Sequence, residues 1–288
     1  MVMAEVPIGY LERIRALIPD LKLYSISLNT DGLINDVVLV NEALVFRFAK
    51  GEHGRKVLAD ELRVMAIARP CLSLPIPDPF FVSEDLIAYP LLSGLPLRRE
   101  RVYALSPGDQ QTLADQLAEF LFTLHGIRAV DLPSTLAPVT PQRWIEMRQR
   151  IREKVYPLLL PHQRTWAEQL FGFIDDPANF NYQAGLIHGD LAPYHLLVDE
   201  NSPRLSGVLD FGTAGLGDPA SDFGCLAQNY GERFINRLQS KYPLLEDYMP
   251  RMRFYAQAIE LEWVLSGLES GEDFWFTAHL GGARDLAG

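Results

Sequence analysis

Apolar residues recur along the first third of the chain with two different periods. A stripe at helical spacing over residues 10–21 predicts one helix, and a second stripe over 54–68 predicts another. Pro70 ends the second helix, because proline has no backbone N–H to continue it. The segments 23–28 and 37–48 are rich in Val, Ile, Leu and Phe instead, and this texture predicts strands.

Turn signals between these segments arrange the strands into a small sheet. A polar turn at 29–32 separates the first two strand segments. The longer segment is expected to fold back on itself at Asn41-Glu42, as a hairpin. Two further short strands are predicted near 79–83 and 86–90. The first third is therefore expected to be a sheet with one helix inserted.

Beyond a Gly- and Pro-containing break at 93–96, helical periodicity dominates. One non-helical segment, 184–218, interrupts it. These patterns predict an α+β protein with a β-rich N-terminal lobe over 1–93, a hinge at about 90–95 and a larger helical lobe over 94–288. The helices are expected at roughly 108–126, 141–156, 162–175, 219–230, 231–240 and 248–268.

Charge and cysteine usage narrow the class of partner. The chain of 288 residues has 26 Lys plus Arg against 37 Asp plus Glu, a net charge of −11. Such a chain has no electrostatic reason to bind nucleic acid or an anionic membrane, whereas an acidic cleft would favour a cationic small molecule. Cys71 and Cys225 form no C-x-x-C pair, which argues against a disulfide framework. We find no signal peptide or spanning segment, and expect a cytoplasmic monomer.

The non-helical segment carries the candidate chemistry. Strand-like runs at 196–198 and 207–209 flank a turn, and a hairpin there would bring Asp190, His195 and Asp210 together at its open end. Phosphoryl transfer needs such a set: one carboxylate orients the nucleophilic hydroxyl, and further ligands hold Mg²⁺ ions on the nucleotide phosphates.

The order of these residues resembles the catalytic core of aminoglycoside phosphotransferases and related antibiotic kinases. The resemblance is carried by His188-Gly-Asp190, by His195 and by Asp210-Phe-Gly212. It implies a two-lobe, protein-kinase-like fold. It also implies that Asp190 is the catalytic carboxylate, that His188 supports its loop, and that His195 and Asp210 are metal ligands. The same resemblance implies that Asp222, in the helix start after the metal site, braces the loop.

One position departs from the common family pattern. The family usually has Asn where this chain has His195. Neutral imidazole can ligate a metal, although Mg²⁺ prefers oxygen, so a weaker second metal site is expected. The sequence His195-Leu-Leu is similar to the aminoglycoside 2''-phosphotransferase branch. His125, at the end of an amphipathic helix, also matches a family position and is expected to be structural.

The N-terminal lobe is expected to hold the nucleotide phosphates. A kinase needs a turn over the phosphates, a cation on the next strand and a helix carboxylate that holds the cation. Gly32 and Asn35 fit the turn. By resemblance, Arg47 takes the place of the usual Lys, and Glu61 is its ion-pair partner. The alternative from the residues alone is an exposed strand Arg and a solvated helix Glu.

The segment 88–94 is expected to receive the purine base. The resemblance makes Tyr89 the gatekeeper and places the Pro90 carbonyl and the Leu92 amide at the base edge. A bulky aromatic gatekeeper narrows the back of an adenine slot, so we expect GTP to be used at least as well as ATP.

The acceptor is expected to lie against the late helices. At helical spacing Glu262, Ser266 and Glu269 share one face. We take Glu262 and Glu269 as candidates for binding substrate ammonium groups, against the alternative of a solvated acidic helix end. The resemblance makes an aminoglycoside the lead acceptor. Alternatives are a metabolic kinase for choline, a sugar or homoserine, a macrolide or peptide-antibiotic kinase, or a catalytically dead nucleotide-binding regulator.

Overall fold

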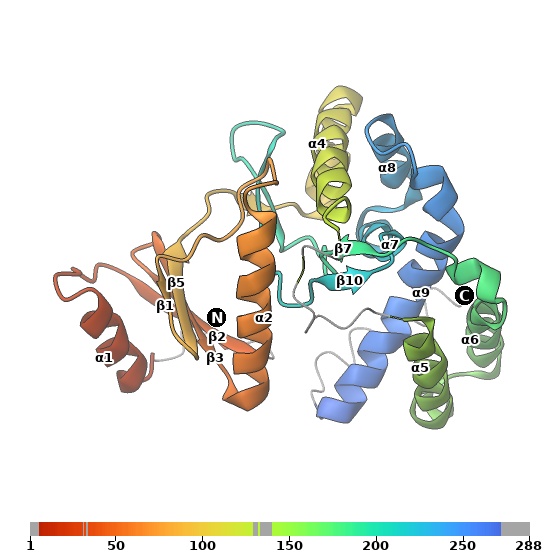
Figure 1. The fold of residues 1–288 in the computed structure, drawn as a ribbon, viewed down its shortest axis with the longest axis horizontal. Coiled ribbons are helices and arrows are strands. Elements are labelled where there is room, and N and C mark those ends of the chain that lie inside the picture. The colour runs from red at the N-terminus through yellow and green to blue at the C-terminus, as the bar shows by residue number, and fades with distance from the viewer. Residues whose placement is uncertain (1–5, 31, 33, 129–131, 133–139, 272–288) are drawn as a thin grey trace.

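Residues 6–30, 32, 34–128, 132 and 140–271 are described by the computed structural model (Figure 1). The N-terminal part is built on one antiparallel sheet with the strand order β1-β2-β3-β5-β4. Its strands are β1 Ile26–Asn29, β2 Asn35–Val40, β3 Leu44–Ala49, β4 Phe81–Val82 and β5 Leu86–Pro90.

The two faces of this sheet are covered by different helices. Helix α1 (Ile8–Leu17) packs on the face to which Phe46 and Phe48 of β3 point. Helix α2 (Gly51–Ala68) lies on the opposite side of the sheet, where Leu58 meets Val45 (Figure 1). Because side chains alternate along a strand, Arg47 points to the same face as Val45 and therefore towards α2.

The predicted hairpin between β2 and β3 is confirmed. The Ala43 amide donates a hydrogen bond of 3.0 Å to the Val40 carbonyl, and the two central residues of this turn, Asn41 and Glu42, have left-handed φ values of 54° and 52°, as a type I′ turn requires. Asn tolerates this conformation better than most residues. Its side chain also accepts a hydrogen bond of 2.7 Å from the amide of Tyr24, which ties the turn to the segment before β1.

Most of the C-terminal part is helical, and α7 and α9 pack against one another at its centre. Helices α4 and α7 and the short strands share one large apolar core, and α5, α6 and α9 share a second. The helices are α3 Arg99–Ala104, α4 Pro107–His125, α5 Pro141–Lys154, α6 Pro161–Gly172, α7 Ala220–Tyr230, α8 Glu232–Ile235 and α9 Leu245–Ser270. The single-turn 3₁₀ segments are Tyr156–Leu158, Phe173–Asp175, Pro177–Phe180 and Asn236–Ser240.

Two small sheets take four of their five strands from the segment predicted to be non-helical, and β6 comes from the end of the predicted hinge. One has the order β6-β8-β9 and the other pairs β7 with β10. The chain leaves the first sheet at Pro90, and five residues later β6 pairs with β8 of the C-terminal part. The predicted hinge at 90–95 coincides with this change of partner. The strands are β6 Leu95–Pro96, β7 Gly185–Ile187, β8 Leu196–Val198, β9 Leu205–Val208 and β10 Gly215–Gly217.

The β-rich beginning and the helical remainder confirm the predicted α+β class. Helix α3 was not predicted, because its six residues are too few to show a period. The same holds for β6 and β10, which have two and three residues. Throughout the part of the chain that the structure describes, no helix combines the length and the apolar character needed to cross a bilayer.

Candidate active site

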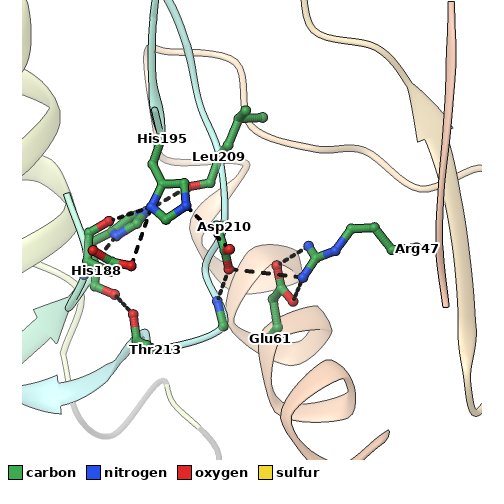
Figure 2. Close-up of polar contacts among 9 residues, drawn as sticks. Arg47, Glu61, His188, His195, Leu209, Asp210 and Thr213 are labelled. Carbon is green, nitrogen blue, oxygen red and sulfur yellow. Dashed lines mark hydrogen bonds and ion pairs between the residues drawn. The ribbon is translucent and has the colours of Figure 1, made fainter. Parts of the chain in front are cut away.

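The hairpin of β8 and β9 brings His195 and Asp210 together (Figure 2), and Asp190 lies on the other side of the His195 ring, as the spacing of the three residues predicts. The Leu209 amide donates a hydrogen bond of 2.8 Å to the His195 carbonyl, so the pairing continues to the open end of the hairpin. There the His195 ring lies between two carboxylates. Its Nδ1 is 3.6 Å from Asp190 Oδ2, and its Nε2 is 3.4 Å from Asp210 Oδ2.

Hydrogen bonding fixes the tautomer of His195. The ring Nδ1 is 2.9 Å from the backbone carbonyl of Asp190, which can only accept, so Nδ1 carries the proton. In the neutral ring, the lone pair of Nε2 then faces the carboxylate of Asp210. These two acceptors attract only when a proton or a metal cation lies between them, and an imidazole oriented through its other nitrogen is typical of metal sites.

The backbone of Asp210 is held in an unusual conformation. Its φ of 61° is rare for a residue other than glycine. The Gly212 amide donates a hydrogen bond of 3.2 Å to Asp210 Oδ1. Burial alone would raise the pKa of Asp210, but Arg47, His195 and the Gly212 amide outweigh it and lower the pKa. Asp210 is therefore a stable anion that points towards Nε2 of His195.

The donor set fits a magnesium ion that is shared with nucleotide phosphates. Asp210 offers a hard carboxylate oxygen, and His195 in its neutral form offers Nε2. Within the described residues, no group of three or more His, Cys, Asp or Glu side chains could hold a metal by itself. Mg²⁺ is usually bound in this way, by one or two carboxylates while phosphates and water complete the octahedron.

His188 and Asp222 hold the loop of Asp190 from below. Burial lowers the pKa of His188 to about 4, so its ring is neutral. His188 Nε2 donates a hydrogen bond of 3.0 Å to the Leu209 carbonyl. The buried carboxylate of Asp222 accepts the amides of His188 and Gly189, both at 2.8 Å. His125 lies 3.0 Å from the same carboxylate, which gives it the structural position expected for it. Because His188 is fully buried, it positions Asp190 and does not itself reach a substrate.

Arg47 and Glu61 form a bidentate ion pair beneath the sheet (Figure 2). The two N–O distances are 2.7 and 3.0 Å, and the residues are 6% and 2% exposed. The alternative of an exposed Arg and a solvated Glu is therefore wrong. Burial disfavours the charge on Arg47, yet Glu61, Tyr89 and Asp210 together raise its pKa. Nη2 of Arg47, one of the two nitrogens bonded to Glu61, also lies 4.0 Å from Asp210 Oδ1, so the pair adjoins the candidate metal ligand.

The segment expected to bind the base continues from β5. Tyr89 is buried opposite Val45 of β3, in the small core of α2. The Leu91 amide donates a hydrogen bond of 2.7 Å to the Ala43 carbonyl, so the backbone remains paired just past Pro90. Leu92 is half-buried and lies against Gly207. A Cβ atom added to Gly207 would come within 3.1 Å of Leu92 Cδ1.

The turn before β2 has a feature that the sequence reading missed. Gly32 leaves no room for a side chain, since a Cβ would lie 2.9 Å from the Asn35 carbonyl oxygen. The buried Oδ1 of Asn35 has no hydrogen-bond partner in the described part of the chain. Lys50, at the end of β3, donates to the carbonyls of Thr30 at 2.9 Å and Gly32 at 2.6 Å. Lys50 therefore fixes the turn from below, three residues after Arg47.

A cavity of about 570 Å³ opens beside Asp190, between α5, α7 and α9. Its lining combines aromatic and aliphatic side chains, among them Trp144 and Trp263, with four carboxylates and one guanidinium. The charged members of the lining are Arg143, Asp190, Asp218, Glu260 and Glu262. Asp218 is neutralised by Arg251 at 2.7 Å, which does not line the cavity. The remaining excess of negative charge would favour a cationic occupant.

The two acidic candidates of α9 are placed differently. Glu262 lines the cavity, as does Ser266, and it pairs with Arg143 of α5. Glu269 does not line the cavity, and its carboxylate binds Arg150 and, at 2.7 Å, Lys154 of α5. The structure therefore does not bring Glu269 to the candidate site: it lies outside the described cavity lining, where α5 supplies two cations.

The helical spacing that selected Glu262 and Glu269 did not select two further cavity residues. Glu260 of α9 accepts a hydrogen bond from Gln228 of α7. Tyr194 stacks edge-on against the His195 ring, with centroids 4.4 Å apart, and is half-exposed next to Asp190. Only the packing of helices distant in sequence brings these side chains to one surface.

Known proteins match a part of the chain that includes the candidate active-site residues. The model of the phosphotransferase enzyme family matches residues 25–255. Viomycin phosphotransferase of Streptomyces vinaceus is 29% identical over 150 residues, which are 51% of this chain and 51% of that protein. The uncharacterized protein YcbJ of Bacillus subtilis (strain 168) is 33% identical over 190 residues, 62% of this chain and 60% of that protein. The matches thus span between half and three fifths of these relatives.

Solved structures match over almost the entire chain. The GDP complex of aminoglycoside 2'-phosphotransferase-IIIa has a TM-score of 0.89 at 25% identity, covering 98% of this chain and 99% of that one. The GDP and kanamycin complex of APH(2'')-IIIa has a TM-score of 0.88, also at 25% identity, covering 97% and 98%. Macrolide 2'-phosphotransferase type I shares the fold, with a TM-score of 0.74 at 22% identity, covering 96% and 97%.

Proposed function

The chain belongs to the phosphotransferase enzyme family, and from this premise we propose that it transfers the γ-phosphoryl group of ATP or GTP to a hydroxyl of an aminoglycoside. The family and the protein-kinase-like fold predicted from the sequence are both confirmed. The matches to antibiotic phosphotransferases favour this acceptor class over a metabolic substrate. One observation carries the proposal: Asp190 lies between a His195–Asp210 pair and an acidic cavity.

The nucleotide would bind on the side of the N-terminal sheet. Arg47 is aligned by Glu61 and lies 4.0 Å from Asp210, where a cation can bind phosphate oxygens. Gly32 and Asn35 shape the turn above the phosphates, and the Pro90 carbonyl and the Leu92 amide would face the base edge. Intact Arg47–Glu61 pairing also argues against a catalytically dead regulator, because this contact is the one an active kinase needs.

Asp210 and His195 would hold Mg²⁺. When bound, the ion neutralises charge on the nucleotide phosphates. In the chain itself, the role of Asp210 is to remain ionised, and the role of His195 is to present Nε2 while its Nδ1–H is bound to the Asp190 carbonyl. Both residues belong to one hairpin, so their separation is set by strand pairing.

Asp190 would orient the acceptor hydroxyl and take its proton. The hydroxyl oxygen attacks the γ-phosphorus, the bond to the leaving nucleoside diphosphate oxygen breaks, and the proton passes to the Asp190 carboxylate. Burial raises the pKa of Asp190, although the neighbouring His195 partly opposes this. A carboxyl with a raised pKa is a better proton acceptor than an ordinary one. His188 and Asp222 keep the loop in place for this step.

The acceptor would occupy the cavity beside Asp190, with Glu260 and Glu262 as partners for its ammonium groups. Trp144 and Trp263 provide apolar surface against which rings can pack. We further propose a cytoplasmic monomer without a nucleic-acid or membrane partner, which the net charge of −11 supports. Light scattering of the purified chain would measure its mass directly.

The decisive experiment offers a panel of acceptors to the purified protein with ATP or GTP and Mg²⁺. The panel should hold kanamycin, viomycin, a macrolide, choline and homoserine, and mass spectrometry should identify the phosphorylated product. The Asp190→Asn variant serves as the control for contaminating kinases. We expect phosphorylated kanamycin with the wild-type protein alone. Turnover of choline or homoserine in its place would contradict the proposal.

A further inference from the structure

One cation belongs to the protein's own acceptor cavity. Arg143 is the single Lys or Arg among the described residues that line it, and it pairs with Glu262 across the cavity wall. The guanidinium also lies over the ring of Trp144, 5.6 Å from its centroid. The pair thus occupies part of the surface on which an acceptor would bind.

Helix stability does not account for this arginine. Arg143 lies in the first turn of α5, which begins at Pro141 and has no acidic residue in that turn. A cation there opposes the helix dipole, which favours negative charge at the N-terminus. The Arg143 side chain is 46% exposed and gains little apolar burial. Its clear partner is Glu262, whose side chain is 23% exposed.

Glu262 needs a cation more than an ordinary surface carboxylate does. Burial raises the pKa of Glu262, and Arg143 and Arg150 offset this only in part. A second cation could therefore bind Glu262 favourably, but it would have to take the place of the guanidinium that is already there. An uncharged acceptor has no cation that could replace Arg143, so the Arg143–Glu262 ion pair would remain in the cavity wall.

We propose that Arg143 is a resident counter-ion of Glu262 which an acceptor ammonium group replaces on binding, so that the protein selects acceptors with a cation at this point. The inference rests on the proposed function, because it assumes an ammonium-bearing acceptor in this cavity. It assigns Arg143 a role in specificity that the family motifs do not include, since α5 carries none of them.

Removal of the resident cation should strengthen binding of a cationic ligand. In Arg143→Gln, kanamycin no longer competes with a guanidinium, and its dissociation constant should fall by about fivefold, as expected for loss of one partly exposed ion pair. Arg143→Lys keeps the charge and should retain the wild-type constant. Binding can be measured without nucleotide, by tryptophan fluorescence, because Trp144 and Trp263 line the cavity.

Arg152 provides a matched control on the same helix. It forms the same kind of partly exposed ion pair with Glu168 of α6, outside the cavity lining. Arg152→Gln should therefore leave the kanamycin constant unchanged. The fluorescence adds a second signature: in the wild type, kanamycin should alter emission as the guanidinium leaves the Trp144 ring, and in Arg143→Gln the change should be smaller.

Three results would overturn the inference. Weaker kanamycin binding by Arg143→Gln would show that Arg143 contacts the acceptor directly. An unchanged constant, or an equal change in Arg152→Gln, would show that the pair is not displaced. Absence of kanamycin binding by all of the proteins would contradict the proposed function and, with it, the inference that rests on it. Failure of the inference alone looks different, since kanamycin would then bind and be phosphorylated, but Arg143→Gln would not bind it more tightly.

Discussion

The nucleotide side of the site and the acceptor side are built in opposite ways. Arg47 and Glu61 are buried, fully paired and fixed by a strand and a helix that follow one another in the chain. Arg143 and Glu262 are partly exposed and come from helices 119 residues apart. In the proposed function, the buried pair binds a group that does not vary, the nucleotide phosphates. The exposed pair would admit any acceptor that brings a cation to Glu262.

The largest effect should come from the residue that joins the two sides. Asp190→Asn keeps the shape of the side chain but cannot accept the hydroxyl proton, so kcat should fall by about 10²–10⁴-fold. The affinity for nucleotide should remain close to that of the wild type, because Asp190 faces the acceptor cavity. Steady-state kinetics with titration calorimetry of the nucleotide would measure both. Normal turnover would remove Asp190 from the mechanism.

The metal pair should show an unequal response on the nucleotide side. Asp210→Ala removes the anionic ligand, and Mg²⁺-dependent nucleotide binding should weaken by more than the ~10–100-fold typical of supporting groups. His195→Asn replaces the nitrogen with an amide oxygen, which Mg²⁺ tolerates, and should keep partial activity. Binding measured with and without Mg²⁺ separates the two variants. A metal-bound structure in which His195 faces away from the ion would refute its assignment.

The sequence predicts the nucleotide side of the site better than the acceptor side. His188, Asp190, His195 and Asp210 lie within 23 residues, so one hairpin fixes their geometry, and strand alternation with helical spacing then brings Arg47 to Glu61. The acceptor side depends on how α5, α7 and α9 pack. Helical spacing places Glu262 and Glu269 on one face but cannot show that α5 supplies cations to the second.

Local detail was lost for a different reason. Helix α3 is too short to show a period, and the contacts of Lys50 with the carbonyls of Thr30 and Gly32 depend on the path of a turn. Neither feature leaves a pattern in the order of residue types. Such contacts add to a site whose main parts are already determined by its motifs.

The buried side should also make stability depend on pH. Burial holds the pKa of His188 at about 4 in the folded chain, below the ordinary histidine value of 6.5. The unfolded chain therefore binds the proton first, and stability is lost as the pH falls from 6.5 towards 4, by about 3 kcal/mol in all. The free energy of unfolding, measured with urea at several pH values in this range, should depend less steeply on pH for His188→Gln than for the wild type. His162→Gln, at an exposed position, is the control and should keep the wild-type slope.

The acceptor side should respond through KM. Replacing both Glu260 and Glu262 with Gln removes two cavity carboxylates, and KM for kanamycin should rise by about tenfold and depend less on salt. KM for the nucleotide should not change. Glu269→Gln, on the same helix but outside the cavity lining, should leave both constants as they are. An unchanged KM for kanamycin in the double variant would mean that these carboxylates do not bind the acceptor.

The smallest effect concerns the choice between GTP and ATP at the proposed base site. Tyr89 is buried between β3 and α2, and the Leu91–Ala43 hydrogen bond holds the backbone after it. A rigid aromatic wall should disfavour the adenine position and favour that of guanine, so kcat/KM for GTP should equal or exceed that for ATP by a few-fold, about 1 kcal/mol. Tyr89→Met should shift the ratio towards ATP, because a flexible side chain can leave the slot open. Val45→Ile, a change in the same small core, controls for altered packing and should not move the ratio. A strong preference of the wild type for ATP would show that Tyr89 does not narrow the slot.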